Sequence, residues 1–436
     1  MKIKIIEKSY KDVMELSVPK HKKPKKIDLF FRTLIKLLSV FKLKKHHVKY
    51  NEVGMDRIGK KQPCLVLMNH SSFVDMEIAA NYLYPRPFST ICTTDGFVGM
   101  SWLMHTIGCI PTPKFVSDIS LIKDMSYALK ELKSNVLMYP EACYSFDGTS
   151  STLSEGLGKL VKLLGVPVVT MITHGAFTRE PLYNMLKQRN VDISVDVTYL
   201  ITPEELNELS DDEINEKIHA AFSFDAFKWQ KENEVKVSNP DRADGLERVL
   251  YKCPHCLHEG TTVGKDTTLT CRECGKTYEL TELGQMRAVD GETEFEHIPD
   301  WFAWERNEAR AEIERGEYLL DIDVDVYMLV DYKGIYHVGD GHLTHSTDGF
   351  HLTGSDGELD YKQPPLSCHS INSDYYWYEI GDMISIGNRR HLFYCFPKDQ
   401  SIPVAKTKLA AEELYKIKRA DKRAHDNASE AQSTHA

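Results

Sequence analysis

Asn69, His70 and Asp75 are the residues whose types and spacing most directly suggest chemistry. They follow Cys64–Met68, a short apolar run that indicates a buried strand. In a turn from a strand into a helix, this spacing lets the Asp75 carboxylate reach back to one imidazole nitrogen of His70. The other nitrogen can then take a proton from an alcohol, because the carboxylate fixes the tautomer and stabilises the imidazolium. The segment therefore predicts a histidine–aspartate pair that activates a hydroxyl group.

Three further segments follow this motif and make it more specific than a histidine and an aspartate alone. They are IGCIPTPKF at residues 107–115, VLMYPEACYSFDG at 136–148 and GVPVVTMITHGAF at 165–177. In order and spacing, the four blocks resemble those of the glycerolipid acyltransferases with an NHxxxxD motif, the family of 1-acylglycerol-3-phosphate acyltransferases. The resemblance covers roughly residues 50–200, which is under half of the chain.

Carried over position by position, this resemblance implies direct attack of an acceptor hydroxyl on an acyl thioester. His70 would be the general base, Asp75 would orient it, and Asn69 belongs to the same block. Pro140-Glu141 matches the block whose glutamate helps to place the acceptor. The donor would be acyl-CoA or acyl carrier protein. The acceptor would be a lysophospholipid, with 1-acylglycerol-3-phosphate expected first, in phospholipid synthesis or remodelling.

The block around Glu141 departs from the family pattern. After the glutamate the family has Gly-Thr-Arg, whereas this chain has Ala142-Cys143-Tyr144 and keeps only the following serine. A tyrosine hydroxyl cannot replace the bidentate contact that an arginine makes with phosphate. The missing charge could come from three cations: Lys114, Lys123 or Arg179. We expect four residues to bind substrate: Asn69, Lys114, Glu141 and Ser145.

Two Cys-x-x-Cys pairs, Cys253 with Cys256 and Cys271 with Cys274, are separated by 14 residues. Four thiolates in two such turns are typical of a closed tetrahedral site, the pattern of a zinc ribbon. A redox-active pair is the alternative, and two matched pairs argue against it. Because four cysteines leave no open coordination position, we expect a structural zinc ion that takes no part in catalysis.

Charge is distributed unevenly along the chain. The 436 residues carry a net charge of −10, yet residues 1–60 contain 17 Lys and Arg against 6 Asp and Glu. A basic arm on an acidic protein is expected to meet an anionic surface, and a membrane fits better than nucleic acid. The cysteine-bearing segment 249–285 has nearly balanced charge, so we expect no nucleic-acid partner. The 42% apolar and 27% charged residues exclude gross disorder and a multi-span membrane protein.

Residues 27–47 predict an amphipathic helix with lysine-rich flanks. The polar positions form one narrow stripe: Asp28, Arg32, Lys36, Ser39 and Lys42. The apolar positions face away from it: Leu29, Phe30, Leu34, Leu37, Leu38 and Phe41. A helix of this kind can lie in the interface of a bilayer, and the alternative is a helix that packs on its own domain. The first residues lack the pattern of a signal peptide, so we expect a cytoplasmic protein on the inner face of the membrane.

The coarse pattern predicts an α/β protein with several parts. Continuous apolar strands alternate with helical segments and imply a glycerolipid-acyltransferase-type domain, in which helices flank a mixed or parallel sheet. A zinc ribbon and an aromatic-rich β domain follow, and the β pattern resembles a pleckstrin-homology-like fold. The expected parts are a basic amphipathic segment (1–48), the acyltransferase domain (49–235), the zinc ribbon (249–285), the β-rich domain with its terminal helix (318–420) and a disordered tail (421–436).

A second hypothesis is that the chain is a decayed acyltransferase. In that case, it would act as a membrane-associated binding or scaffold protein that presents its accessory domains to a partner. The altered residues Ala142-Cys143-Tyr144 favour this hypothesis. The intact residues Asn69, His70, Asp75 and Glu141 oppose it.

Overall fold

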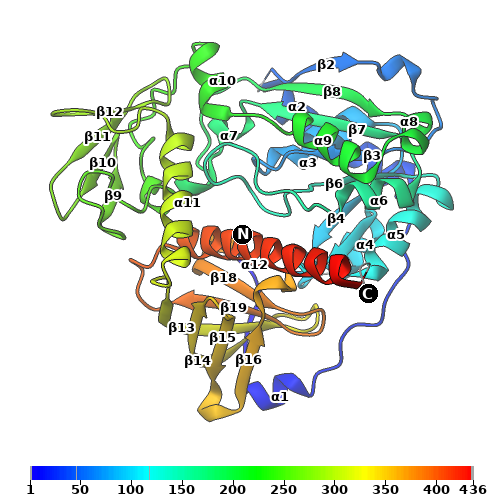
Figure 1. Ribbon diagram of the computed structural model, residues 1–436. Coiled ribbons are helices and arrows are strands. Elements are labelled where there is room, and N and C mark those ends of the chain that lie inside the picture. Colours follow the sequence, from blue (N-terminus) through cyan, green and yellow to red (C-terminus); the bar gives the residue numbers. More distant parts are fainter. Residues whose placement is uncertain (1, 46, 117, 434–436) are drawn as a thin grey trace. The chain divides into compact units, whose positions relative to one another are not determined.

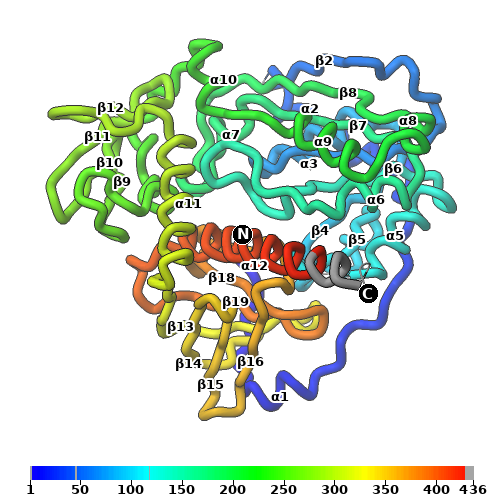
Figure 2. Tube along the Cα trace, in the orientation of Figure 1, coloured from blue at the N-terminus to red at the C-terminus, as the bar shows by residue number. Residues whose placement is uncertain are grey.

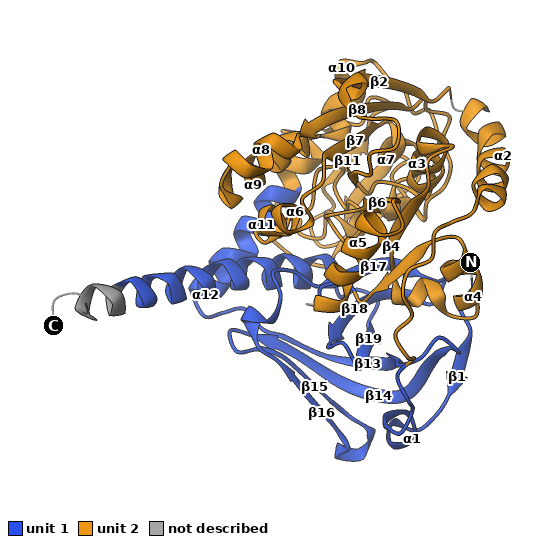
Figure 3. Cartoon of the chain, turned by 90° about the vertical axis from the view of Figure 1, so that its right-hand side faces the viewer, with its two compact units in different colours: residues 1–18, 114–117, 302–436 blue, residues 19–113, 118–301 orange. Residues whose placement is uncertain are grey.

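The computed structural model describes residues 2–45, 47–116 and 118–433 (Figure 1). Figure 2 follows the same chain as a tube from its amino-terminal to its carboxy-terminal end. The chain forms two compact units (Figure 3). Unit 1 comprises Met1–Val18, Lys114–Ser117 and Phe302–Ala436, and unit 2 comprises Pro19–Pro113 and Asp118–Trp301.

Unit 2 is built on a seven-stranded mixed sheet. Neighbouring strands run parallel except for the antiparallel pair β7 and β8. In spatial order the strands are β2 (Lys49–Val53), β8 (Ser194–Ile201), β7 (Val168–His174), β3 (Leu65–Met68), β6 (Asn135–Met138), β4 (Phe88–Thr93) and β5 (Cys109–Thr112). The mixed sheet flanked by helices agrees with the α/β fold class that the apolar runs predict.

Helices cover both faces of this sheet, because side chains of the central strand β3 alternate between two cores. Leu65 and Leu67 pack in one core, and Val66 and Met68 in the other. The first core includes α5 (Ile119–Lys130), α6 (Leu157–Leu164), α8 (Pro203–Glu208) and α9 (Asp211–Ala221). The second includes α2 (Leu29–Lys45) and α3 (Val74–Leu83). Three short helices complete this part of the unit: α4 (Ser101–Thr106), α7 (Ala176–Arg179) and α10 (Ala226–Glu232).

The cysteine-bearing module also belongs to unit 2 and is a small antiparallel sheet. Its strands, in order, are β12 (Met286–Ala288), β11 (Thr277–Leu280), β10 (Thr268–Cys271) and β9 (Thr262–Lys265). Residues 236–248, which precede it and whose Pro, Asp and Gly are typical of a linker, are partly buried, and Ala243 and Leu246 are fully so. The Tyr183 hydroxyl donates to the carbonyl of Arg242, so this segment packs on the rest of the unit.

Unit 1 contains an eight-stranded sheet, antiparallel except at one edge contact. Along the sheet the strands are β16 (Leu359–Gln363), β15 (Gly349–Gly354), β14 (Ile335–Ser346), β13 (Leu320–Leu329), β19 (Leu392–Pro397), β18 (Gly381–Gly387) and β17 (Asn372–Trp377). Strand β1 (Ile5–Glu7) pairs in parallel with the start of β14. Three helices accompany it: α1 (Tyr10–Met14), most of α11 (Ile298–Glu314) and α12 (Val404–Ser433), which packs against β17 and β18.

Two boundaries differ from the sequence-based expectation. Residues 1–48 do not form one segment, because β1 joins the sheet of unit 1 whereas α2 packs in unit 2. The terminal helix α12 continues to Ser433, through residues that we expected to be disordered. Alanine, lysine and glutamate in this stretch are good helix formers, which explains the continuation. The last three residues of the expected tail, 434–436, lie outside the described part of the chain.

Candidate functional site

The candidate site lies in unit 2, where β3 ends and α3 begins. Asp75 stands in the first turn of α3 and is fully buried. Its Oδ2 accepts hydrogen bonds from the backbone N–H groups of Ser71 (2.8 Å) and Ser72 (2.9 Å), and lies 3.2 Å from Nδ1 of His70. Burial raises the pKa of the Asp75 carboxyl, whereas the hydrogen bonds from these three residues act in the opposite direction. The predicted histidine–aspartate contact is therefore present.

The imidazole of His70 is held between two aromatic rings. Tyr139 stacks on it with ring centroids 4.2 Å apart, and Tyr144 with centroids 3.9 Å apart. Phe73 in turn meets Tyr144 edge-on at 5.6 Å. Burial raises the pKa of Tyr139 well above its ordinary value, so this ring stays neutral beside the histidine. The two rings restrict the imidazole plane, and 19% of the His70 side chain remains exposed.

The Glu141 carboxylate supports the loop that carries His70 by accepting hydrogen bonds from backbone N–H groups. It is only 1% exposed, and its two carboxylate oxygens accept from the N–H groups of His70 (3.1 Å) and Ser151 (3.0 Å). The carboxylate thus joins the loop after β3 to the loop after β6. The resemblance assigns this glutamate to acceptor placement, and the structure places it where it also determines the position of His70.

We expect Glu141→Gln to destabilise the protein as well as to lower its rate of acyl transfer. The oxygen of the glutamine amide can accept from one of the two N–H groups, but its NH₂ group then faces the other N–H. That second N–H loses its acceptor, which costs about 1–3 kcal/mol of unfolding free energy. Chemical denaturation checks this, with the exposed Glu208→Gln as the matched control. A raised KM with no loss of unfolding free energy would instead show that Glu141 acts on the acceptor alone.

Asn69 and Ser145 are fully buried, and their hydrogen bonds stay within the protein. The Asn69 side chain bonds to the backbone of Thr173 on β7, accepting from its N–H (2.8 Å) and donating to its C=O (3.2 Å). The backbone N–H of Ser145 donates to the carbonyl of His70 (3.0 Å), and its hydroxyl closes the turn to Thr149 (2.6 Å). Both residues position the His70 loop, and direct substrate binding by them remains a prediction.

Among the candidate cations, Arg179 is not at a surface. It is fully buried and pairs with Glu180 at 3.2 Å, and burial lowers its pKa. The other oxygen of Glu180 accepts from the Ser72 hydroxyl (2.7 Å), so this pair supports the loop that carries His70. Lys114 belongs to unit 1, where its ammonium donates to Asn372 at 3.3 Å. Lys114 and His70 thus belong to different units, and a role of Lys114 in binding remains a prediction.

Another of the histidine–aspartate pairs of unit 2 lies at the end of β7. His174, at the end of β7, is 3.0 Å from Asp196 of β8 through Nε2, and its ring stacks on Trp229. It borders a cavity of about 640 Å³ whose wall also contains Phe222 and Lys228. The Asp196 side chain is 48% exposed, in contrast to the fully buried Asp75. This pair is a natural comparison for His70.

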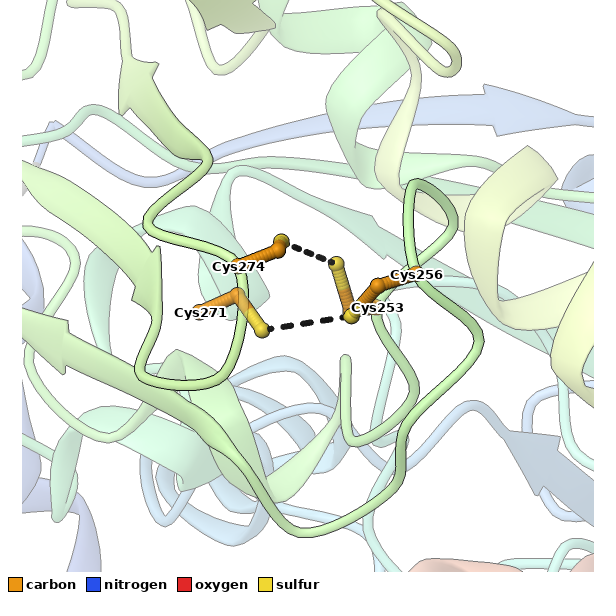
Figure 4. Close-up of side chains that lie close together, drawn as sticks. All are labelled: Cys253, Cys256, Cys271 and Cys274. Carbon is orange, nitrogen blue, oxygen red and sulfur yellow. Dashed lines mark hydrogen bonds between the residues drawn. The ribbon is translucent and has the colours of Figure 1, made fainter.

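The four cysteines of the two pairs come together at one end of the small sheet (Figure 4). All four sulfur atoms lie within 4.8 Å of one another. Sγ of Cys253 is 3.8 Å from that of Cys274, and Sγ of Cys256 is 3.7 Å from that of Cys271. A tetrahedral zinc–thiolate site with bonds of about 2.3 Å has sulfur–sulfur edges of about 3.8 Å. The residues present therefore fit a tetrahedral metal ion.

Helix α2 packs on the protein through Leu43 and several polar residues, and it turns six apolar residues outward. Arg32 donates to the carbonyl of Pro85, Lys36 to the side chain of Asn81 (2.7 Å), and Lys42 to Glu77 (2.9 Å). The six apolar residues predicted to share a face are all exposed: Leu29, Phe30, Leu34, Leu37, Leu38 and Phe41, the last at 77%. No helix of the described residues is long and apolar enough to cross a membrane.

Part of the chain matches a family of known proteins. Residues 23–174, from just before α2 to the end of β7, match the family model named Acyltransferase. No curated protein matches the chain. A solved structure, the 1-acyl-sn-glycerophosphate (LPA) acyltransferase PlsC from Thermotoga maritima, is similar at 16% sequence identity and a TM-score of 0.32. The similarity covers 44% of this chain and 79% of that one.

Proposed function

We propose that this chain, which carries an acyltransferase domain at residues 23–174, moves a fatty acyl group from a thioester to a hydroxyl of a lysophospholipid-like acceptor. The observation that carries the proposal is the 3.2 Å contact between Nδ1 of His70 and the buried carboxylate of Asp75. The imidazole ring of His70 is also held between the rings of two tyrosines. With Nδ1 protonated and bonded to Asp75, Nε2 carries the lone pair that can accept a proton.

In the proposed reaction the acceptor oxygen attacks the thioester carbonyl. His70 Nε2 takes the hydroxyl proton as the C–O bond forms, and Asp75 stabilises the resulting imidazolium. The C–S bond then breaks, and the proton passes from His70 to the departing thiolate. The products are an ester and a thiol. The thioester already supplies an activated acyl group, so His70 needs to move only one proton in each direction.

The donor is proposed to be acyl-CoA or acyl carrier protein, and 1-acylglycerol-3-phosphate is the first acceptor to test. Tyr144 is the position at which this chain differs most from the family motif. There, an aromatic ring stacks on His70 in place of an arginine side chain. An aromatic face suits the glycerol and acyl portions of a lysolipid better than its phosphate, so acceptors without a phosphate belong in the same comparison.

The test is acyl transfer by the wild-type chain with both donors and a panel of acceptors on anionic vesicles. The panel contains 1-acylglycerol-3-phosphate, other lysophospholipids and alcohols without phosphate. We expect one ester formed for each thiol released, with both dependent on the acceptor. A folded, metal-loaded protein that forms no ester with any acceptor would favour the binding or scaffold hypothesis.

Helix α2 is proposed to place the enzyme on the membrane surface, at the inner face in a cell. Its polar side chains bond to the protein, and within the described residues its outward apolar face is exposed to solvent. Leaving several large apolar side chains in water is costly, and inserting them into the bilayer interface removes that cost. A surface location would bring a lysolipid acceptor to the site without extraction into water.

We expect Leu38→Ser combined with Phe41→Ser to weaken vesicle binding at least ~10-fold, since each apolar side chain contributes about 1.5–3 kcal/mol when buried. Because Leu38 and Phe41 are 72% and 77% exposed, thermal stability should stay unchanged. Co-sedimentation with vesicles measures the effect. Leu163→Ser, which alters an exposed leucine of α6, is the control, and equal loss in the control would argue against insertion of α2.

The four-cysteine site is proposed to hold a structural zinc ion. The support is the fit of the sulfur positions to a tetrahedron and the choice of four thiolates, which suit zinc. When bound, the ion would link the two Cys-x-x-Cys turns and thereby stabilise the module. It supplies no catalytic step, because four cysteines complete its coordination.

A further inference from the structure

A basic cleft lies in unit 2 away from the site described above. Its volume is about 310 Å³, and its lining includes five cations and no carboxylate: Lys26, Lys60, Lys61, Arg86 and Lys133. Within the described residues, none of the four lysines forms an ion pair. Arg86 donates to the carbonyl of Gln62, which fixes the position of its guanidinium in the wall.

The cleft is formed by the loops at the amino ends of three parallel strands. Residues 60–63 precede β3, residues 85–87 precede β4, and residues 133–134 precede β6. Asn135 ties these loops together, since it accepts from the N–H of Cys64 (3.0 Å) and donates to the carbonyl of Pro87 (3.0 Å). His70 follows the carboxyl end of β3. A four-residue strand of about 13 Å therefore separates the cleft from the catalytic loop.

One of these cations has an unusual backbone conformation. Lys133 adopts a left-handed conformation, with φ of 49°, that a lysine rarely takes. Like-charged side chains gathered without a carboxylate repel one another, and an anion of high charge density relieves that repulsion. A phosphate group fits both the charge and the small volume of the cleft.

The cleft adjoins the start of helix α2. Lys26 lies just before the first turn of α2, and Arg32 of the same helix donates to the carbonyl of Pro85 in the wall. The outward apolar residues of α2 begin at Leu29. A ligand that is both anionic and embedded in a bilayer would therefore meet the cleft and the helix together.

We infer that this cleft binds the phosphate headgroup of an anionic phospholipid in the membrane on which α2 rests. The inference rests on the proposed membrane docking of α2 and is independent of acyl transfer at His70. The bound lipid is an anchor that is neither donor nor acceptor, because the cleft and the catalytic loop lie at opposite ends of the strands. It would also set the rotation of α2 about its axis by fixing the loop beside its first turn.

The test measures binding of the full chain to vesicles of phosphatidylcholine with and without phosphatidylglycerol. Lys60→Gln/Lys61→Gln removes two cations of the cleft. Lys133→Asn removes a third with a residue that tolerates the left-handed backbone. The matched control, Lys231→Gln/Lys236→Gln, removes two exposed charges elsewhere in the unit. All of these positions are exposed, so each variant should melt at the wild-type temperature.

We expect the double cleft variant to bind the anionic vesicles about 30-fold more weakly, the factor for two lysines at an anionic surface. Binding to pure phosphatidylcholine should not change, nor should transfer to a detergent-dispersed acceptor. Lys133→Asn should weaken anionic binding in the same direction. The α2 variant Leu38→Ser/Phe41→Ser should instead lose binding to both kinds of vesicle, which separates failure of the cleft from failure of the docking helix.

Three results would overturn the inference. Equal losses in the cleft variant and in the control would show that only total charge matters. Competition of inorganic phosphate for the cleft, with vesicle binding unaltered in the cleft variants, would assign a free phosphate as the ligand. A cleft variant with wild-type vesicle binding that loses transfer from acyl carrier protein and keeps transfer from acyl-CoA would assign the cleft to an acidic protein partner.

Discussion

Replacing His70 with alanine is expected to lower kcat for acyl transfer by about 10²–10⁴-fold, the usual contribution of a positioned general base. The loss should be in kcat more than in KM, because the imidazole acts on the proton that moves in the transition state. The variant should still fold, since the His70 side chain stacks between Tyr139 and Tyr144 and is partly exposed to solvent. Rates of thiol release and of ester formation measure the effect.

The matched control is His174→Ala. This residue is also a half-buried histidine paired with an aspartate in unit 2, and it also stacks on an aromatic ring. We expect its loss to leave kcat within about 3-fold of wild type, well below the effect of a general base. If both variants lost activity equally, or if His70→Ala kept wild-type kcat, the assignment of His70 as base would be wrong.

Loss of the proposed zinc ion is expected to unfold the cysteine module. Bound zinc contributes on the order of 10 kcal/mol to a small module of this kind, which equals or exceeds the stability of most domains. Cys256→Ser should therefore abolish stoichiometric zinc binding and lower the melting temperature. Arg242 joins the module to the rest of unit 2, since its Nε donates to the carbonyl of Leu280 and its own carbonyl accepts from Tyr183, so the stability of this unit should fall with that of the module.

Two measurements test this effect. Atomic emission gives the zinc content, and thermal melts with and without a chelator give the change in melting temperature. Cys368→Ser is the matched control, because Cys368 is a partly buried cysteine of unit 1 outside the cluster. Wild-type zinc content in Cys256→Ser would contradict the assignment of the four cysteines as ligands. A chelator that removes zinc with no change in the melting temperature would contradict its structural role.

The central motif could be predicted from the sequence because its geometry is local. His70 and Asp75 lie on one strand-to-helix turn, and their contact depends on a spacing of five residues. The exposed face of α2 could also be predicted, since helical periodicity alone assigns Phe30, Leu38 and Phe41 to one side. That this side faces outward depends on the polar contacts of Arg32 and its neighbours, which periodicity does not determine.

Other parts of the site depend on contacts between distant segments. The tyrosines at 139 and 144 flank the Pro-Glu block, but the sequence does not say that this loop returns beside His70. Glu141 was expected at the acceptor, and its bond to the His70 N–H depends on the parallel pairing of β3 with β6. The aromatic spacing around the block was the signal that could have suggested a stack.

The parts of the fold that the sequence does not predict also have physical reasons. Strand β1 has three residues and pairs with β14 more than 300 positions away, so no local pattern marks it. Strand β4 contains serine and threonine residues, which reduce the apolar signal of a buried strand. Residues 236–248 have the Pro, Asp and Gly content of a linker, yet tertiary contacts bury several of them.

The most direct measurement of the central claim is a double-mutant cycle on kcat/KM for His70→Ala and Asp75→Asn. If Asp75 acts by orienting and stabilising the His70 imidazole, the two residues form one unit and their effects are not additive. We expect Asp75→Asn to lower the rate strongly by itself and to cause no further loss when His70 is alanine. Free-energy losses that add, with His70→Ala/Asp75→Asn slower than the wild type by the product of the two single-variant factors, would contradict the proposed mechanism.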